Sequence, residues 1–391
     1  MMGTTLRQVN RLVLQKQHLA EDARIEDIER VTDEIGGLHA TGATTPYLSL
    51  LARCPDFRKD TLDDALYRRK SLGRMRCMRK TIYVLNRAMM PVAWKATGAM
   101  VQKASRRYME ARGTSPQEYE ALAQTILDMV RGRGMTATAI KQAVSAQGDV
   151  SAVLYLMCDQ GLLVRGQPEG GWKDQQYRYA SFAEYFPGVD LEQWGEEEAT
   201  VLLVERYLRA YGPATENDLA WWTGLGKRRV RTALKSLPEP VTQVHITGLK
   251  EEYLLLQADE ERLQHADPPS DPAVSLLPSL DPYLMGYKDR ERYIDQHVYP
   301  YVFDRAGNAT STILKDGRVA GVWDFEDQPA PLVKLHLFQR CESYVLDDIY
   351  RQAHRLGAFI ADRETGVALC EQMVPLPERS AGSFMSPLRG C

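Results

Sequence analysis

The sequence predicts an α+β fold, with tandem winged-helix domains followed by a β-rich C-terminal domain. Two patterns support this fold class. Helical stretches, with apolar residues three or four positions apart, alternate with short stretches rich in β-branched and aromatic residues. After about residue 273, strand-like runs become more frequent. Three short helices followed by a two-stranded hairpin are the plan of a winged helix, and the chain repeats this order.

The N-terminal unit, residues 1–112, is expected to contain several short helices and to continue into a strand. Apolar residues recur at helical spacing up to Leu38, but Gly36 and Gly37 interrupt the pattern, which indicates a break. Residues 74–85 are rich in residues that favour strands. Helices are expected within residues 5–39, 46–52 and 62–72.

The second unit, residues 113–197, is predicted to be a winged helix. Ser115 is a suitable N-cap, and Pro116 suits the first position of a helix. Two more helices are expected at residues 135–140 and 151–160, and a hairpin with strands at 162–165 and 177–180.

The third unit, residues 198–262, has the clearest winged-helix pattern. After a helix at 201–211, Thr215 is a good N-cap for the second helix, and residues 227–235 form the third. The basic residues of the third helix cluster in its first turns, where a helix-turn-helix element meets DNA. The alternative is a helix-turn-helix that serves only packing. The wing is expected at residues 244–246 and 253–256.

The C-terminal domain, residues 273–391, is expected to follow a polar, proline-containing linker at 263–272. A helix is predicted at 342–356, and the last dozen residues are expected to be loose. Strands are expected at residues 311–314, 318–323 and 332–337, with shorter ones at Phe359 and 367–369.

Positive charge is concentrated in one part of a chain whose net charge is −3. There is no acidic residue between Asp64 and Glu110, although that interval is rich in lysine and arginine. This segregation predicts a positive surface facing a polyanion, and the alternative is a solvated basic face.

The remaining composition excludes several classes of protein. The six cysteines lack CxxC spacing, so we expect reduced thiols in a cytoplasmic protein and no metal site. No secretory signal and no stretch long enough for a membrane helix is present. No cofactor motif is found, so no cofactor is expected, and a monomer is taken as the default.

Five blocks in the same order give a more specific indication. Together they resemble the AlkZ/YcaQ-like family of winged-helix DNA glycosylases. The blocks lie at residues 36–53, 78–84, 211–225, 277–287 and 316–323.

This resemblance implies a C-shaped arrangement of the domains around duplex DNA. It implies hydrolysis of the N-glycosidic bond of alkylated purines, of the N7-alkylguanine type and including bulky or cross-linked adducts. The partner would be double-stranded DNA containing alkylated bases, and the role would be base excision repair. Some members of the family protect antibiotic producers from their own DNA-alkylating products.

The sequence departs from the family at the catalytic motif. Where the family carries a glutamine paired with glutamine or aspartate, this chain has His39 and Thr41. An N7-alkylated guanine already carries a positive charge, so it can leave without being protonated. A neutral imidazole at His39 can accept a proton from the attacking water, and the Thr41 hydroxyl can fix that water's second hydrogen bond. Because His39 must be neutral, cleavage is expected to fall below about pH 6.5.

Other interpretations of these residues remain open. His39 lies four residues after Ile35, so a continued helix would make it a hydrogen-bonded core histidine, with Thr41 as a helix N-cap. A literal Gln-X-Gln occurs at Gln15 and Gln17, and we treat it as a decoy on a solvated first helix.

Several residues are candidates for contacts with DNA. Arg79 is the best candidate for a phosphate contact, and the alternative is a structural ion pair. Tyr283 is expected either to abut the lesion or groove or to pack in the core. The backbone contacts expected from the third unit are Lys227, Arg228, Arg229 and Arg231.

A second function stays open at this point: a non-catalytic winged-helix regulator or lesion sensor that kept the fold and lost the glutamine pair. Polar groups able to hold water remain at His39 and Thr41, which favours the enzyme.

Overall fold

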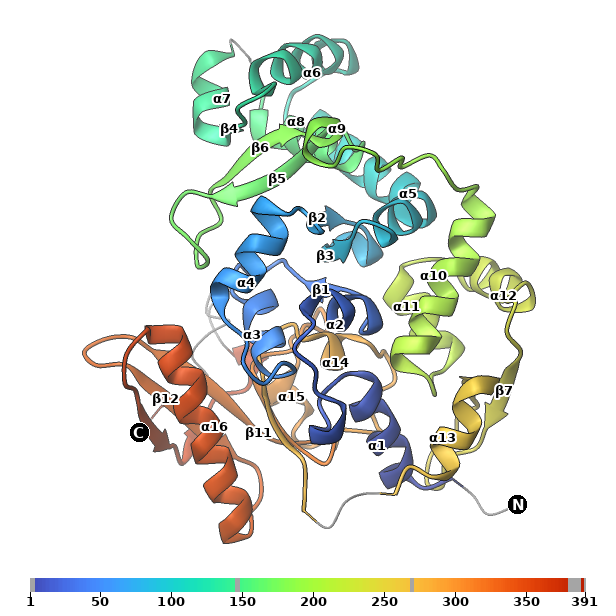
Figure 1. The fold of residues 1–391 in the computed structure, drawn as a ribbon, viewed down its shortest axis with the longest axis vertical. Helices are drawn as coiled ribbons and strands as arrows, with labels where there is room; N and C mark the ends of the chain where they lie inside the picture. Colours follow the sequence, from blue (N-terminus) through green and yellow to red (C-terminus); the bar gives the residue numbers. More distant parts are fainter. Residues whose placement is uncertain (1–3, 145–147, 268–270, 379–387, 390–391) are drawn as a thin grey trace.

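The computed structural model describes residues 4–144, 148–267, 271–378 and 388–389. The N-terminal unit lies in the middle of the molecule, with the second unit above it in Figure 1. The third unit lies to the right of the centre and the C-terminal sheet to the lower left. The structure is mixed helix and sheet, which confirms the broad fold class.

The N-terminal unit places a small sheet among short helices. Its three strands are ordered β1-β3-β2 and pair antiparallel. The unit ends in a long helix that the sequence analysis did not expect, α5. The elements are α1 (Leu6–Lys16), α2 (Ile28–Glu34), β1 (Leu38–His39), α3 (Thr45–Leu51), α4 (Lys59–Asp63) with a π-helical turn (Asp64–Arg68), β2 (Leu72–Arg76), a 3₁₀ turn (Met78–Lys80), β3 (Ile82–Asn86) and α5 (Met89–Ala111).

The second unit has its own hydrophobic core and matches most of its predicted elements. Met135 and Thr136, predicted as the start of a helix, instead form strand β4, and helix α9 was not predicted. Ser115 accepts a hydrogen bond from the amide of Glu118, and the Glu118 carboxylate accepts one from the amide of Ser115, which confirms the predicted N-cap. The elements are α6 (Pro116–Val130), β4 (Met135–Thr136), α7 (Ala137–Ala143), α8 (Val150–Asp159), β5 (Leu163–Pro168), β6 (Tyr177–Ser181) and α9 (Phe182–Tyr185).

The third unit also has the predicted order of helices. The Thr215 side chain caps the second helix in a reciprocal arrangement with Asp218, and Gly224 ends that helix with a left-handed φ of 75°. The first strand of the hairpin begins earlier than predicted. The elements are α10 (Glu196–Tyr211), α11 (Glu216–Thr223), α12 (Lys227–Lys235), β7 (Val241–Val244), β8 (Tyr253–Leu256), a 3₁₀ turn (Gln257–Asp259) and α13 (Glu260–Gln264).

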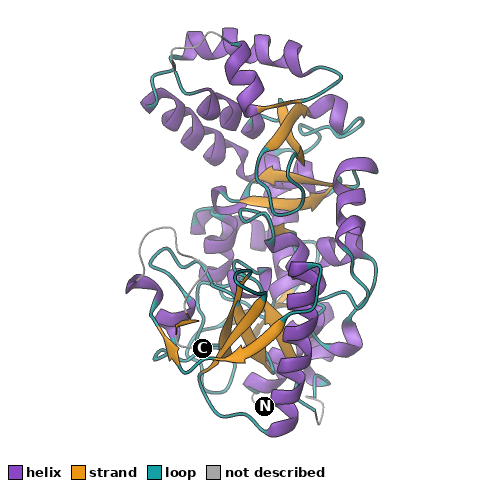
Figure 2. Cartoon of the chain, turned by 90° about the vertical axis from the view of Figure 1, so that its left-hand side faces the viewer, coloured by secondary structure: helices purple, strands orange, loops and turns teal. Residues whose placement is uncertain are grey.

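The C-terminal region is built on a five-stranded sheet in the order β13-β12-β11-β10-β9. Helix α16 packs on this sheet, whose strands lie in the lower half of Figure 2. Phe359 lies inside α16, so the strand expected there is wrong. The elements are β9 (Val274–Leu277), α14 (Pro282–Met285), α15 (Tyr299–Val302), β10 (Thr312–Lys315), β11 (Arg318–Glu326), β12 (Leu332–Leu337), α16 (Ser343–Ala361), β13 (Gly366–Leu369), β14 (Gln372–Met373), a 3₁₀ turn (Leu376–Glu378) and β15 (Leu388–Arg389).

The hydrophobic cores do not follow all of the predicted domain ranges. One core joins side chains from the N-terminal unit, the third unit and the C-terminal region, and a second joins α2 and α3 to α16. The four ranges therefore stay a prediction. Most of the last dozen residues lie outside the described part of the chain.

The structure also bears on the expectations about cysteines and membrane helices. Cys370 is disulfide-bonded, so the expectation that all six cysteines are reduced is wrong at this position. Among the described residues, no helix combines the length and the apolar character needed to cross a bilayer.

Candidate functional site

Two glycines turn the chain from α2 into β1 and so place His39 on a strand. Gly36 and Gly37 have φ values of +78° and +100°, a region that glycine enters without steric cost. A Cβ at Gly37 would lie 2.6 Å from Cδ2 of Leu85. The helix therefore ends before His39, which excludes the interpretation of His39 as part of a continued helix.

His39 is buried but incompletely hydrogen-bonded. It pairs with Tyr83 across β1 and β3, with 5.2 Å between the two ring centroids, and it is 2% exposed. Its Nδ1 has no hydrogen-bond partner among the described residues. Such an orphaned buried atom is costly unless a water or ligand satisfies it, so Nδ1 is a place where a water can be held.

The environment of His39 holds the imidazole neutral. Burial, and secondarily the positive charge of Arg79, lower the pKa of His39 to about 3. The proposed general base is therefore unprotonated over the whole neutral range. The expectation that activity falls below pH 6.5 is therefore wrong, because it assumed a histidine with an ordinary pKa.

Arg79 lies on the tight turn between β2 and β3, with a left-handed φ of 51°. Its guanidinium stacks on Trp221 of α11, 3.5 Å from the ring centroid. No carboxylate pairs with it in the described part of the chain, so the alternative of a structural ion pair is not observed. The stack holds the side chain in place and leaves its hydrogen-bond donors available to an anion.

A second arginine lies beside the same tryptophan. Arg290 has its Cζ 5.2 Å from the Trp221 ring centroid and donates to the hydroxyl of Tyr299 and the carbonyl of Gly307. Burial and the nearby charge of Arg290 lower the pKa of Arg79. Two cations held close together favour an anion between or beside them.

Thr41 is exposed at the start of the loop that leads to α3. Its carbonyl accepts a hydrogen bond of 3.4 Å from Nε2 of Gln175, at the tip of the β5–β6 hairpin. The N-cap position of α3 is Thr44, so Thr41 is not a helix cap. Its hydroxyl is thus open to solvent, unlike the imidazole of His39.

The β5–β6 hairpin also bridges two other parts of the molecule. At its tip, Trp172 lies edge-on to Tyr47 of α3 and to Phe359 of α16, with centroid separations of 5.3 and 5.7 Å. Lys59 sits over both the Trp172 and the Phe359 ring. Sequence analysis missed this contact, because a hairpin's sequence predicts its turn but not what the turn touches.

The four basic residues of α12 divide into two pairs. Lys227 and Arg228 are exposed, and neither side chain is bonded to another described residue. Arg229 instead pairs with Glu196 at 2.9 Å and donates to the Thr200 hydroxyl at 2.7 Å. The last of the four, Arg231, pairs with Glu216 at 2.8 Å. Lys227 and Arg228 are therefore the better candidates for DNA contacts.

The position of Tyr283 contradicts its expected contact with DNA. It is 0% exposed. Its hydroxyl donates to the carbonyl of Gly317 at 2.7 Å and accepts from Arg292 at 3.1 Å. The residue is part of the core, so the expectation of a contact with a lesion or groove is wrong.

The acid-free interval is only partly a basic surface. Arg74 is buried against tyrosines, and Arg76 pairs with Asp159 at 2.8 Å. The charge of Arg76 is neutralised by an acid from a distant part of the chain, and the charge of Arg74 is covered by tyrosines, neither of which local composition reveals. The cations of the interval without a carboxylate partner among the described residues are Lys70, the buried Arg74, Arg79, Lys80, Arg87, Lys103, Arg106 and Arg107.

The glutamines of the literal Gln-X-Gln serve structural contacts. Gln15 donates to Asp22, and the buried Gln17 donates to the carbonyl of Ala210. Lys16 between them is buried in an ion pair with Asp259. These contacts support the interpretation of a decoy, although the helix face is less solvated than expected.

Comparison with known proteins identifies the class of this fold and site. A family model described as DNA glycosylase AlkZ-like matches residues 32–359, most of the chain, which defines a class of DNA repair glycosylases. The chain belongs to the AlkZ-like DNA glycosylase family.

Individual relatives agree with this assignment. The interstrand DNA cross-link repair glycosylase of Streptomyces sahachiroi is 27% identical over 240 residues, which are 56% of this chain and 62% of that protein. The solved structure of the Streptomyces sahachiroi DNA glycosylase AlkZ aligns with a TM-score of 0.76 at 22% identity. That alignment covers 94% of this chain and 100% of the other, so the two share a fold.

Proposed function

We propose that this protein hydrolyses the N-glycosidic bond of alkylated purines in duplex DNA. The substrates would be of the N7-alkylguanine type. Bulky or cross-linked adducts are included, because one relative is named for interstrand cross-link repair. The observation that carries the mechanism is the orphaned, neutral Nδ1 of His39 at the position of the family's catalytic motif.

In the proposed reaction, a water bound at Nδ1 attacks the anomeric carbon as the alkylated base departs. The imidazole accepts the proton of that water, and the base leaves with the electron pair of the broken bond, neutralising its own charge. The Thr41 hydroxyl provides the second hydrogen bond to the water. General base assistance of this kind contributes about 10²–10⁴-fold.

The same proposal includes winged-helix units, a C-shaped path for DNA and a monomeric state. In it, Arg79, Lys227 and Arg228 hold phosphates without selecting bases. A cytoplasmic repair role, or protection of a producer from its own alkylating product, would follow from this substrate class.

One observation favours the second candidate function, a regulator or lesion sensor without catalysis. His39 is 2% exposed, so no substrate reaches its ring unless the side chains above it move. In the catalytic proposal, binding of DNA moves the side chains that cover the ring and opens this path.

The experiment that tests the proposal incubates the protein with duplex DNA containing N7-methylguanine and then treats it with alkali to cut at abasic sites. His39→Ala and Thr41→Ala should slow single-turnover release, whereas the matched control Gln15→Ala should not. Release that survives both site substitutions would refute the catalytic assignment. No release from any alkylated duplex, with binding retained, would favour the regulator.

A further inference from the structure

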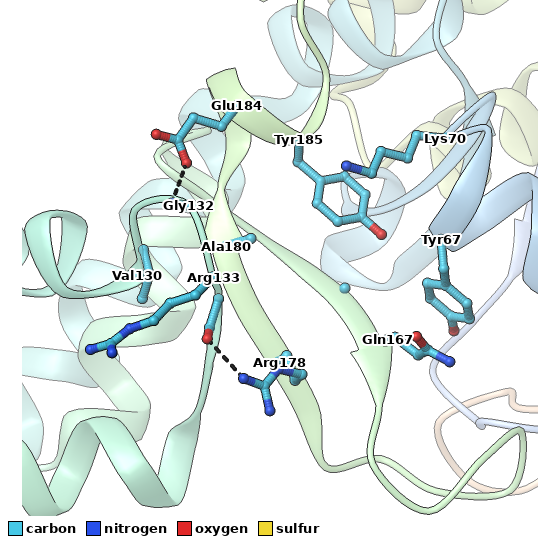
Figure 3. Close-up of a pocket in the computed structure, with 12 residues that line it drawn as sticks. Tyr67, Lys70, Val130, Gly132, Arg133, Gln167, Arg178, Ala180, Glu184 and Tyr185 are labelled. Carbon is cyan, nitrogen blue, oxygen red and sulfur yellow. Dashed lines mark hydrogen bonds between the residues drawn. The ribbon is translucent and has the colours of Figure 1, made fainter.

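A cavity of about 460 Å³ separates the second unit from the N-terminal unit (Figure 3). One wall is formed by Tyr67 and Lys70, which follow α4. The opposite wall is formed by the loop after α6 and by strands β5 and β6, including Arg133 and Arg178. The cavity is distinct from the surroundings of His39 and Thr41, which do not line it.

Positive charge predominates in this cavity. Of its twelve lining residues, Lys70, Arg133 and Arg178 are cations, and Glu184 is the one acid. The carboxylate of Glu184 already accepts a hydrogen bond of 3.0 Å from the amide of Gly132, as Figure 3 shows. The cavity therefore carries a surplus of positive charge.

Two of these cations have no anionic partner among the residues that the structure describes. The Nζ of Lys70 lies 4.2 Å from the centroid of the Tyr185 ring, and this contact orients it. The side chain of Arg133 reaches only the carbonyl of Met129 and the sulfur of Met135, at 3.4 and 4.0 Å. Both are weak contacts for a charged group.

The third cation is positioned more firmly. Arg178 donates to the carbonyl of Gly134 at 3.0 Å and pairs with the half-exposed Glu169 at 3.2 Å. A guanidinium has five donors in a planar fork, so these two bonds leave others available. Oriented cations from both walls match the oxygens of a phosphodiester better than they match a neutral ligand.

The cavity lies close to the candidate site along the β5–β6 hairpin. Gln175, whose side chain bonds the carbonyl of Thr41, is three residues before Arg178. Three residues span at most about 11 Å. Because duplex DNA advances about 3.4 Å per base pair, one duplex of about two helical turns is long enough to reach both the candidate site and this cavity.

We propose that the cavity binds a backbone phosphate of the duplex that flanks the lesion. Lys70 and Arg178, one on each wall, are the residues that hold it, because the side chain of Arg133 extends away from Lys70 and Tyr67 in Figure 3. This inference rests on the proposed function only in that DNA is the ligand. It adds an anchor on the second unit, remote from the basic helix α12.

The test measures binding of an undamaged duplex of about two helical turns, ~20 base pairs, by fluorescence anisotropy over a range of salt concentrations. The variants are Lys70→Asn and Arg178→Gln. Asparagine suits position 70 because the backbone there has a φ of 54°. The matched control is Lys141→Gln on α7, an exposed lysine that does not line the cavity. Thermal unfolding midpoints equal to that of the unchanged protein establish that each variant folds.

Each cavity variant should weaken binding and lower the magnitude of the log–log salt slope by about 0.9, the value for one phosphate contact. The control should leave the slope unchanged. An unchanged slope in both cavity variants would overturn the inference, and so would an equal loss in the control. Because the duplex is undamaged, the result is independent of whether base release occurs, so failure here and failure of the glycosylase proposal can be told apart.

Discussion

Because His39 is neutral in the folded protein, we predict that the free energy of unfolding depends on pH. In the unfolded chain this histidine takes up a proton below about pH 6.5, its ordinary value. In the folded protein burial, aided by Arg79, lowers the pKa to about 3. The unfolded state therefore binds one more proton between these two values, so the folded state loses stability as the pH falls from 6.5 to 3.

The size of this effect follows from the difference between the two pKa values. One pKa unit corresponds to about 1.4 kcal/mol, so the whole window is worth about 5 kcal/mol. Between pH 7 and 4.5 the loss from His39 alone should be about 2–3 kcal/mol. Other groups also titrate in this range, and the comparison with a variant removes their contribution.

The assay is urea unfolding of the unchanged protein and of His39→Gln at pH 7 and at pH 4.5. Glutamine has an amide in place of the imidazole and does not titrate. The unchanged protein should lose about 2–3 kcal/mol more than the variant between the two pH values. In parallel, single-turnover base release by the unchanged protein should be flat from pH 5 to about 8. Equal losses of stability in the two proteins would show that His39 titrates as an ordinary exposed histidine and would refute this account of the site.

Three further predictions concern the scaffold. Lys227→Ala should lower the magnitude of the salt slope for duplex binding by about 0.9 and leave the thermal unfolding midpoint unchanged. Arg229→Ala breaks contacts within the fold, so it should lower the thermal midpoint and leave the salt slope unchanged. Gly37→Ala should destabilise the protein by about 1–3 kcal/mol in urea unfolding, because of its φ of +100° and the lack of space for a Cβ. Tyr283→Phe should cost about 1 kcal/mol of stability through the lost hydrogen bond to Gly317, and anisotropy titrations should show unchanged DNA affinity.

The local signals of helix ends were the most reliable part of the sequence. Ser115 and Thr215 were predicted as N-caps, and both form reciprocal capping arrangements. A capping arrangement joins residues only three positions apart, so it can be predicted from the local sequence alone. The hairpin of the second unit was predicted for a similar reason, since its two strands are close in sequence.

The elements that were missed depend on contacts between distant segments. Helix α5 contains Pro91 and Gly98, which weaken a helical pattern, yet its buried face packs against α8 and α10. Strand β9 is short and joins the sheet only by pairing with β10, more than thirty residues away. Propensity does not predict either element, because tertiary packing stabilises both.

The identity of the candidate site stays a prediction, and the environment of its residues could not be predicted from the sequence. The position of His39 came from the resemblance, and its residue type suggested a base. Its burial, its unpaired Nδ1 and the neighbouring Arg79 are products of how β1 meets the turn after β2. For Tyr283 the sequence left both a DNA contact and core packing open, since an aromatic residue by itself gives no sign of whether it faces the core or the solvent, and the structure places it in the core.

The charge of Arg79 sets a condition on the proposed chemistry. Two unit positive charges about 4 Å apart repel by roughly 4 kcal/mol near a protein surface. An unpaired guanidinium beside His39 therefore opposes both a cationic alkylated purine and the positive charge that develops on the sugar. A phosphodiester bound to Arg79 would cancel that charge. We infer that the DNA backbone completes the site, so a free N7-methylguanine nucleoside, which has no phosphate to offer, should be hydrolysed far more slowly than the same base in a duplex. Comparable single-turnover rates for the free nucleoside and the duplex, each at saturation, would contradict this role for Arg79.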